Sequence, residues 1–260
     1  MMLACTACGG LRPANLPGDA GGSAYRDYYT GVRPKAAWRS WLRAMADATR
    51  RDYLDRRTPP TAGRVLDYGC GTGDYLARLA RRRPALGCVG TDAIRPADRG
   101  QTYAWLSPSE VGGAGPFDWI TLGHVLEHLD DPVATLSLLA RTLSPGGGVW
   151  IATPNAQSFI IRRAGRWARD IDFPRHRQIF SRKGLDELLA GAGLTPKFLP
   201  APRINAMLNV VSTLKNIAHD RSAPRPERAW AALRTVLHLI VHLIAPAARD
   251  SPELVVVCRR

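Results

Sequence analysis

The chain has 260 residues, 45% of them hydrophobic and 22% charged, which is an ordinary composition for a globular protein. It excludes a chain that is disordered throughout, a collagen and a scaffold held together by disulfides. Lys and Arg number 36 against 22 Asp and Glu, so the net charge is +14. A chain this basic is expected to have an anionic partner, such as nucleic acid, a phosphorylated metabolite or an anionic membrane surface.

The five cysteines stand at positions 5, 8, 70, 88 and 258 without regular spacing, which is typical of a reducing compartment. The sequence shows neither a secretory signal nor an apolar run of about 20 residues. We therefore expect a cytoplasmic protein, with peripheral attachment to the inner face of the membrane as an alternative. Cys5 and Cys8 have the spacing of metal ligands, but no second pair follows them, so no metal is expected.

The chain opens with Gly- and Pro-rich residues 1–24, which are expected to be loose, and a helix is predicted over residues 25–57. From residue 63 to about residue 200, short apolar runs alternate with amphipathic helices. Alternation of this kind predicts an α/β fold with a mostly parallel sheet and helices on both faces. The predicted strands cover residues 64–68, 86–91, 102–106, 117–122, 148–153, 195–199 and 254–258.

Residues 203–250, before the last strand, are predicted to form a helical insertion. Residues 230–245 form its most apolar helix, with Arg234, His238 and His242 in one polar row. That helix is too short to span a bilayer but apolar enough to lie at its surface. The insertion, over residues 204–245, is therefore interpreted as a substrate lid, a dimer contact or a peripheral membrane surface. The expected domains are an N-terminal segment (1–60), a core (61–202 and 251–260) and this helical cap (203–250).

The most informative segment is a predicted strand that ends in Asp67 and continues through three glycines at alternate positions, Gly69, Gly71 and Gly73. Glycines let the backbone turn sharply and approach a ligand closely. The spacing is not the G-x-G-x-x-G of a dinucleotide site, and an acid at this point would repel a pyrophosphate. It suits a ligand that carries an ammonium and a sulfonium group, which is S-adenosylmethionine.

A second acid, Asp92, ends the next predicted strand and could accept both ribose hydroxyls of that ligand. Cys70 lies inside the glycine loop and Ala93 follows Asp92, so both are included among the candidate cofactor-binding residues.

With these stretches the sequence resembles the class I S-adenosylmethionine-dependent methyltransferases, and more narrowly the bacterial small-molecule branch that includes ubiquinone-biosynthesis-like O-methyltransferases. The matching stretches are residues 65–74, 90–92, 117–129, 143–147 and 175–181. The resemblance implies a Rossmann-like seven-stranded sheet in the order 3-2-1-4-5-7-6 with the last strand antiparallel. It also implies that Asp67, the three glycines, Asp92 and the Gly123-His124 turn contact the cofactor, and that residues 1–60 cover it.

One departure from the family concerns the third strand. Relatives often carry an acid there for the adenine amino group, whereas this chain has Leu106-Ser107-Pro108-Ser109. Adenine contacts are therefore expected from the backbone or from Ser107.

Methyl transfer to a hydroxyl also requires a proton acceptor, for which His is the usual side chain near neutral pH. His128 and His176 are the candidate catalytic bases, although each has a structural alternative, a buried hydrogen-bonded pair with Glu127 or a loop histidine. His124 is expected to position the cofactor. Arg175 and Arg177 flank His176 and are candidate ligands of a substrate phosphate or carboxylate, or else solvated surface arginines.

The sequence argues against nucleic acid as the substrate, because the turn after the fourth strand lacks the Asn/Asp-Pro-Pro-aromatic motif and no RNA-binding module is recognisable. We interpret the chain as an S-adenosylmethionine-dependent methyltransferase of a small molecule, acting at oxygen, with a lipid-linked or anionic acceptor left open. The alternatives are a nucleotide-dependent oxidoreductase and a basic membrane- or RNA-associated protein that keeps the fold. The oligomeric state is left open.

Overall fold

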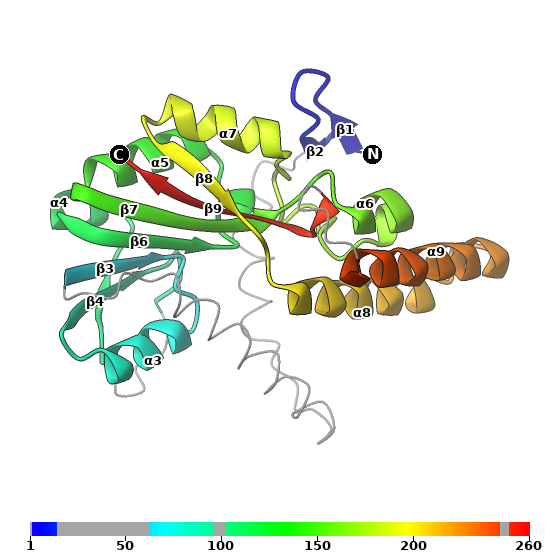
Figure 1. Cartoon of the computed structure of the whole chain (residues 1–260), viewed down its shortest axis with the longest axis horizontal. Helices are drawn as coiled ribbons and strands as arrows, with labels where there is room; N and C mark the ends of the chain where they lie inside the picture. The colour runs from blue at the N-terminus through cyan, green and yellow to red at the C-terminus, as the bar shows by residue number, and fades with distance from the viewer. Residues whose placement is uncertain (1, 15–62, 96–101, 245–249) are drawn as a thin grey trace. The chain divides into compact units, whose positions relative to one another are not determined.

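A computed structural model of the chain describes residues 2–14, 63–95, 102–244 and 250–260 (Figure 1). The chain divides into two compact units, which we describe separately. Unit 1 comprises the described residues of Met1–Arg51, Pro154–Leu185 and Pro200–Leu254. Unit 2 comprises the described residues of Asp52–Thr153, Asp186–Leu199 and Val255–Arg260.

The strands of unit 2 form a seven-stranded sheet, in which the last residue of one strand, Pro154, and the first two residues of another, Glu253 and Leu254, belong to unit 1. Its order is β5-β4-β3-β6-β7-β9-β8, which is 3-2-1-4-5-7-6 in chain order within the sheet, as predicted. Neighbours from β5 to β7 run parallel, whereas β9 runs antiparallel to β8. The strands are β3 (Gly63–Tyr68), β4 (Leu86–Thr91), β5 (Ala104–Leu106), β6 (Phe117–Gly123), β7 (Leu143–Pro154), β8 (Thr195–Leu199) and β9 (Glu253–Arg259).

The helices α3 (Asp74–Arg82) and α5 (Pro132–Arg141) connect parallel strands of this sheet in opposite directions from its centre. Because such crossovers are right-handed, the two helices cover opposite faces, and Figure 1 shows them so. The remaining elements associated with the sheet are α4 (Val111–Ala114), the 3-10 turn η1 (Leu126–His128) and α7 (Arg182–Gly191).

The elements of unit 2 form where local chemistry favours them. Asp131 caps α5 through a 2.9 Å bond accepted from the Ala134 backbone N–H, and Pro132 occupies the first helical position, as predicted. The central strands are apolar on both faces, as expected for strands covered on both sides. Leu66, Ile120 and Ile151 are fully buried there.

Unit 1 begins with a small hairpin of β1 (Met2–Ala4) and β2 (Leu11–Pro13). The expectation of a loose segment is therefore wrong for residues 2–13. The hairpin is ordered by distant residues, since Leu11 bridges Ile179 and the Cys8 carbonyl accepts a hydrogen bond from the Ser181 hydroxyl. These partners lie more than 160 residues away in the sequence, where local composition gives no sign of them.

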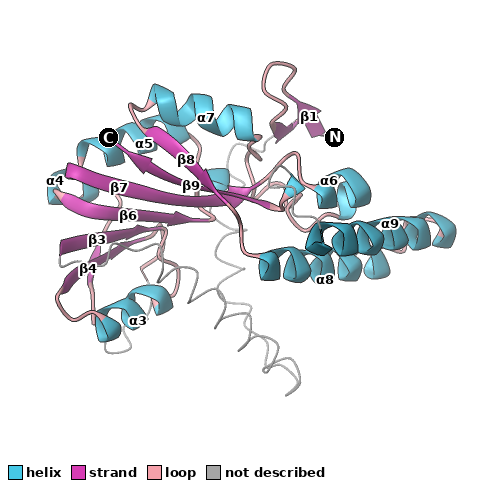
Figure 2. Ribbon diagram, viewed as in Figure 1, coloured by secondary structure: helices cyan, strands magenta, loops and turns pink. Residues whose placement is uncertain are grey.

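The other elements of unit 1 are helical and are drawn as ribbons in Figure 2. They are α6 (Phe159–Ala164), the 3-10 turn η2 (Gly165–Trp167), α8 (Arg203–His219) and α9 (Arg225–Ile244). Helix α9 packs against α8 and α6. Phe159, Ile160 and Val210 are among the residues of their shared apolar core.

The predicted insertion, residues 203–250, thus contains two long helices in its described part. The expected helix over residues 25–57 and the cofactor cover expected from residues 1–60 lie outside the described residues, apart from residues 2–14. The predicted division into three domains remains a prediction. Among the residues that the structure describes, no helix is long and apolar enough to cross a membrane.

Candidate functional site

The candidate site lies in unit 2, at the carboxyl ends of three neighbouring strands. Asp67 near the end of β3 is opposite Gly90 of β4 and Thr121 of β6. Asp92 follows β4, and Gly123 ends β6. This edge, beside the point where the strand order reverses, is where ligands bind in open parallel sheets.

At two positions of the loop after β3, the fold leaves no room for any residue larger than glycine. Gly69, Gly71 and Gly73 all have positive φ values, of 79°, 55° and 74°. A Cβ added at Gly69 would lie 2.3 Å from a Val125 side-chain carbon, and one at Gly73 would lie 1.8 Å from the Tyr103 hydroxyl. The loop therefore needs glycine at these two positions, both for the backbone conformation and for the close approach of Val125 and Tyr103.

Hydrogen bonds fix this glycine loop to the end of β4. The N–H groups of Gly69 and Cys70 both donate to the Thr91 carbonyl, at 2.8 and 2.9 Å. The Gly71 N–H donates to the Asp92 carboxylate at 2.8 Å. Asp92, which is buried, thus joins the loop to the second strand, and one of its oxygens also accepts a 3.3 Å bond from the Ile94 N–H. The neighbouring Ala93 is exposed.

Asp67 is a buried carboxylate in an unfavourable electrostatic setting. Burial raises its pKa to about 6, the hydrogen bond from Thr121 opposes that rise, and the negative charge of Asp92 adds to it. The Thr121 hydroxyl donates to Asp67 at 2.7 Å. A buried carboxylate whose pKa is raised in this way favours a cationic ligand, since a nearby positive charge would offset the penalty on its charged form.

Cys70 lies between the same two acids. Burial, together with the charges of Asp67 and Asp92, raises the pKa of its thiol to about 12. Its side chain therefore stays a neutral thiol at physiological pH and contributes packing rather than a nucleophile.

His124 follows β6 with a backbone φ of 59°, the only positive φ among the described non-glycine residues. Its Nδ1 lies 3.2 Å from Oε1 of the fully buried Glu127. The other Glu127 oxygen accepts a 3.0 Å hydrogen bond from the Thr153 hydroxyl. A non-glycine residue in this region carries strain, so the ring is held in place by its surroundings. The turn places the half-buried His124 side chain at the same edge as Asp67.

The two candidate bases fall in different units. His128 ends η1 in unit 2 and is half-buried. His176 lies in unit 1, with its Nδ1 2.7 Å from the Asp170 carbonyl oxygen. Because a carbonyl can only accept, Nδ1 carries the hydrogen, and Nε2 is the nitrogen able to take up a proton.

The arginines on either side of His176 are also in unit 1 and are half-buried. Arg175 forms an ion pair with Asp172. The loop is fastened to α8, because Asn209 donates a 2.7 Å bond to the Asp170 carboxylate and the Arg169 N–H donates to Thr213.

Comparison with known proteins identifies the family. A family model described as a methyltransferase domain matches residues 37–196. The chain is a member of the methyltransferase domain family. The prediction from the sequence that the chain belongs to a methyltransferase family is thereby confirmed.

Relatives agree with this methyltransferase assignment. The ubiquinone biosynthesis O-methyltransferase of Xanthomonas axonopodis pv. citri is 32% identical over 117 residues, which are 41% of this chain and 49% of the relative. The chain therefore spans about half the length of the curated relatives it matches.

Two solved structures share the fold. A SAM dependent methyltransferase from Archaeoglobus fulgidus has a TM-score of 0.51 at 15% identity, covering 91% of this chain and 98% of that one. A cyclopropane-fatty-acyl-phospholipid synthase-like protein from Lactobacillus casei has a TM-score of 0.53 at 15% identity, with coverages of 90% and 98%. The predicted Rossmann-like fold is confirmed, and so, at the level of the family, is the cofactor S-adenosylmethionine.

Two residues beside the candidate site were not predicted from the sequence. Thr121 and Tyr103 approach Asp67 and Gly73 only through the tertiary structure, so no local pattern indicates them. Glu127 was considered as a partner of His128, and the structure places its Oε1 3.2 Å from His124 Nδ1.

Glu110 was also missed. Its carboxylate accepts bonds from the Ser107 hydroxyl at 2.6 Å and the Ser107 N–H at 2.8 Å. These bonds close the turn that precedes α4, whose N-cap position is Glu110 itself. The Ser107 hydroxyl, considered for adenine, thus donates to Glu110.

Proposed function

We propose that this chain transfers a methyl group from S-adenosylmethionine to a hydroxyl oxygen of a small-molecule acceptor. The observation that carries the proposal is the pair of buried carboxylates, Asp67 and Asp92, beside a glycine loop with no room for side chains at Gly69 and Gly73. The cationic donor fits this setting: its ammonium would lie by Asp67, and its ribose hydroxyls would donate to Asp92. When bound, the donor supplies an activated methyl on a sulfonium.

The remaining cofactor contacts are assigned within the same unit. Gly69, Cys70, Gly71 and Gly73 provide the backbone surface, and Ala93 extends it beyond Asp92. Gly123 and His124 close the edge at β6, where Glu127 holds the His124 ring. Oriented binding of this kind supplies much of the rate acceleration in an in-line transfer.

Proton removal from the acceptor is assigned to His128 or His176. Support for His176 is its tautomer, since the bond to the Asp170 carbonyl leaves Nε2 as the basic nitrogen. Support for His128 is its position one turn after His124 at the same strand edge. Arg175 and Arg177 are proposed to bind an anionic group of the acceptor. The relatives named for ubiquinone biosynthesis support an O-linked, lipid-linked acceptor as the finer form of this proposal.

Calorimetry tests the donor site. S-adenosylhomocysteine should bind with micromolar affinity, and Asp67→Asn and Asp92→Asn should each weaken binding by about tenfold or more, the loss of one charge-assisted bond. Asp118→Asn is the matched control, because Asp118 lies at the opposite end of β6 and bonds the Arg64 N–H. Binding of NAD in place of S-adenosylhomocysteine would indicate an oxidoreductase and overturn the proposal.

A methyl-transfer assay tests the bases. The full chain is incubated with methyl-labelled donor and hydroxylated metabolite extracts, and the labelled product is identified. His128→Gln or His176→Gln should lower kcat by 10²–10⁴-fold, the usual contribution of a general base. His219→Gln is the control, since His219 is exposed at the end of α8 and bonds the Lys215 carbonyl. Labelling of nitrogen or carbon only would contradict the assignment to oxygen.

A further inference from the structure

After a first turn that exposes Arg225 and Glu227, helix α9 presents an outer face of apolar side chains. From residue 229 on, its exposed residues recur at helical spacing over four turns: Ala229, Trp230, Leu233, Val236, Leu237, Ile240, Val241 and Ile244. The exposure is large, reaching 59% for Trp230 and 77% for Ile244. A continuous apolar face of this kind on a protein surface marks a site of interaction.

The polar row of the same helix faces inward. Arg234 donates to the Arg163 carbonyl at 3.2 Å, and His238 Nε2 lies 3.8 Å from the Asp250 carboxylate. His242 is buried, and burial lowers its pKa. The sequence pattern alone predicts the opposite orientation, with the apolar side toward the core.

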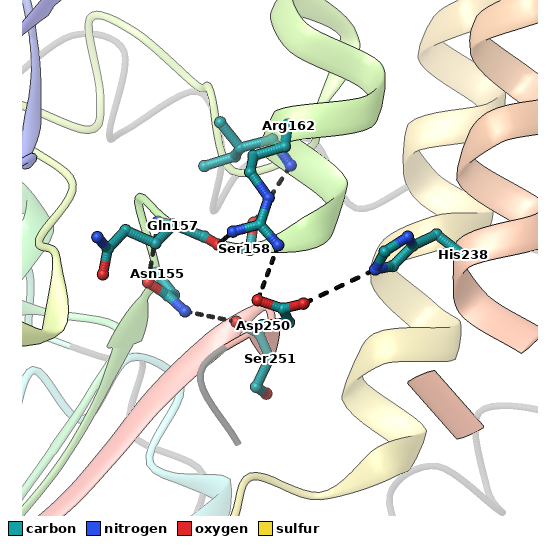
Figure 3. A network of polar contacts seen from close by, with 8 residues as sticks. Asn155, Gln157, Ser158, Arg162, His238, Asp250 and Ser251 are labelled. Atoms are coloured by element: carbon teal, nitrogen blue, oxygen red, sulfur yellow. Dashed lines mark hydrogen bonds and ion pairs between the residues drawn. The ribbon is translucent and has the colours of Figure 1, made fainter. Parts of the chain in front are cut away.

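Side chains from α6 and the segment before β9 hold this orientation, as Figure 3 shows for the contacts of Asp250. Asp250 accepts from Arg162 at 2.7 Å on one side and faces His238 on the other. The Phe159 ring lies 5.1 Å from the imidazole centroids of both His238 and His242. The inward row is thus specifically partnered, so the outward apolar face is a built feature of the fold.

The net charge of unit 1 indicates which kind of partner covers the apolar face of α9. Its described residues carry 15 Lys and Arg against 6 Asp and Glu, a net charge of +9. The described residues of unit 2 carry ten Lys and Arg and ten Asp and Glu, so their net charge is zero. A second copy docked on α9 would bring two strongly positive units together, whereas an anionic lipid surface would match the charge.

From this apolar face and its basic surroundings, we infer that the outer face of α9 inserts into the surface of an anionic phospholipid bilayer. The helix lies along the surface with its apolar side in the headgroup and acyl boundary, because its inward row of Arg and His cannot enter lipid. Basic side chains near both helices, including Arg203, Lys215 and Arg221, meet the headgroups. The inference stands apart from the proposed methyl transfer, since it uses none of the cofactor-binding residues.

Vesicle sedimentation with the full chain tests this inference. The chain should sediment at low salt with vesicles of phosphatidylcholine and phosphatidylglycerol and remain in the supernatant with phosphatidylcholine alone. Leu237→Gln should lower the partition coefficient about tenfold, since burial of one large apolar side chain is lost. Val133→Gln on α5 is the matched control, because the two side chains are similarly exposed, at 53% and 50%.

Several outcomes overturn the inference. One is no sedimentation with anionic vesicles, and another is equal binding by Leu237→Gln and the parent chain. Binding to neutral vesicles as strong as that to anionic vesicles would show that charge does not contribute, which contradicts the inference. Sedimentation velocity that shows a dimer dissolved by Leu237→Gln would make a second copy the occupant. Calorimetry of S-adenosylhomocysteine with Leu237→Gln should match the parent, so failure of the membrane inference is distinguishable from failure of the proposed function.

Discussion

Asp67 shows at the scale of one residue how a binding site opposes stability. Its folded pKa of about 6 lies above the ordinary value of 3.8 for an aspartate, so the folded state binds this proton more tightly than the unfolded state does. The free energy of unfolding therefore falls as pH rises from about 4 through 6. Above pH 6, ionisation of Asp67 lowers the free energy of unfolding by at most an amount on the order of 3 kcal/mol.

Replacement of this carboxylate should separate stability from binding. Asp67→Asn keeps an acceptor for Thr121 and has no ionisable group, so its free energy of unfolding should decline less between pH 4 and pH 7 than that of the parent. Urea denaturation of both chains across this range measures the difference. If the two curves run parallel, the raised pKa of Asp67 is contradicted.

The same carboxylate predicts a pH dependence of donor binding. Protonation of Asp67 removes the negative charge that the donor ammonium meets, so affinity for S-adenosylhomocysteine should fall as pH drops below about 6. Calorimetry at pH 5 to 8 measures this. A flat profile would mean that Asp67 does not pair with the ligand cation.

The cysteines should differ sharply in reactivity. Cys5 is exposed, and hydrogen bonds from the backbone and thiol of Cys8 lower its pKa. Burial raises the pKa of Cys70 and Cys258 to about 12. Alkylation with iodoacetamide near neutral pH should modify Cys5 first and the buried thiols only after unfolding. Peptide mass spectrometry over time gives the order, and early labelling of Cys258 would contradict it.

At the scale of elements, the glycine loop should tolerate no methyl group at Gly73. Gly73→Ala must adopt a left-handed φ, which costs about 1–2 kcal/mol, and it must also displace the Tyr103 hydroxyl. We expect loss of at least that stability together with loss of S-adenosylhomocysteine binding. Gly113→Ala is the control, because nothing lies within 4 Å of its added Cβ, and it should be neutral or stabilising.

The sequence predicted the elements better than it predicted their ends and faces. Strand β7 begins at Leu143 rather than 148, because the Ser-Pro-Gly-Gly turn residues are included in a strand that pairs irregularly with β6. Helix α9 begins at Arg225 rather than 230. Its inward polar row depends on Asp250 and Phe159, which are distant in sequence, so periodicity could locate the helix but could not orient it.

The residues of the candidate site likewise fall into those that the sequence predicted and those that it did not. Asp67, its three glycines and Asp92 form a local motif that the strand–loop–helix pattern of the sequence predicts. Thr121 and Tyr103 are brought to the loop by other segments and could be found only in three dimensions.

At the scale of the whole molecule, charge and cofactor chemistry fall on different units among the described residues. The positive charge is concentrated in unit 1, whereas the candidate donor site lies in the neutral unit 2. Raising salt from about 0.05 to 0.5 M should therefore release the chain from anionic vesicles but leave S-adenosylhomocysteine affinity within about twofold. Parallel sedimentation and calorimetry series measure both, and a donor affinity that falls together with vesicle binding would contradict this separation.

The hairpin at the start of the chain has a consequence for biosynthesis. The Cys8 carbonyl bonds the Ser181 hydroxyl 173 positions later, and the Ala7 carbonyl bonds the Lys183 ammonium across 176 positions. A ribosome that has made the hairpin must translate most of the polypeptide before these partners emerge. Nascent chains arrested ahead of residue 181 should therefore leave the first 14 residues open to protease, and those arrested well beyond it should not.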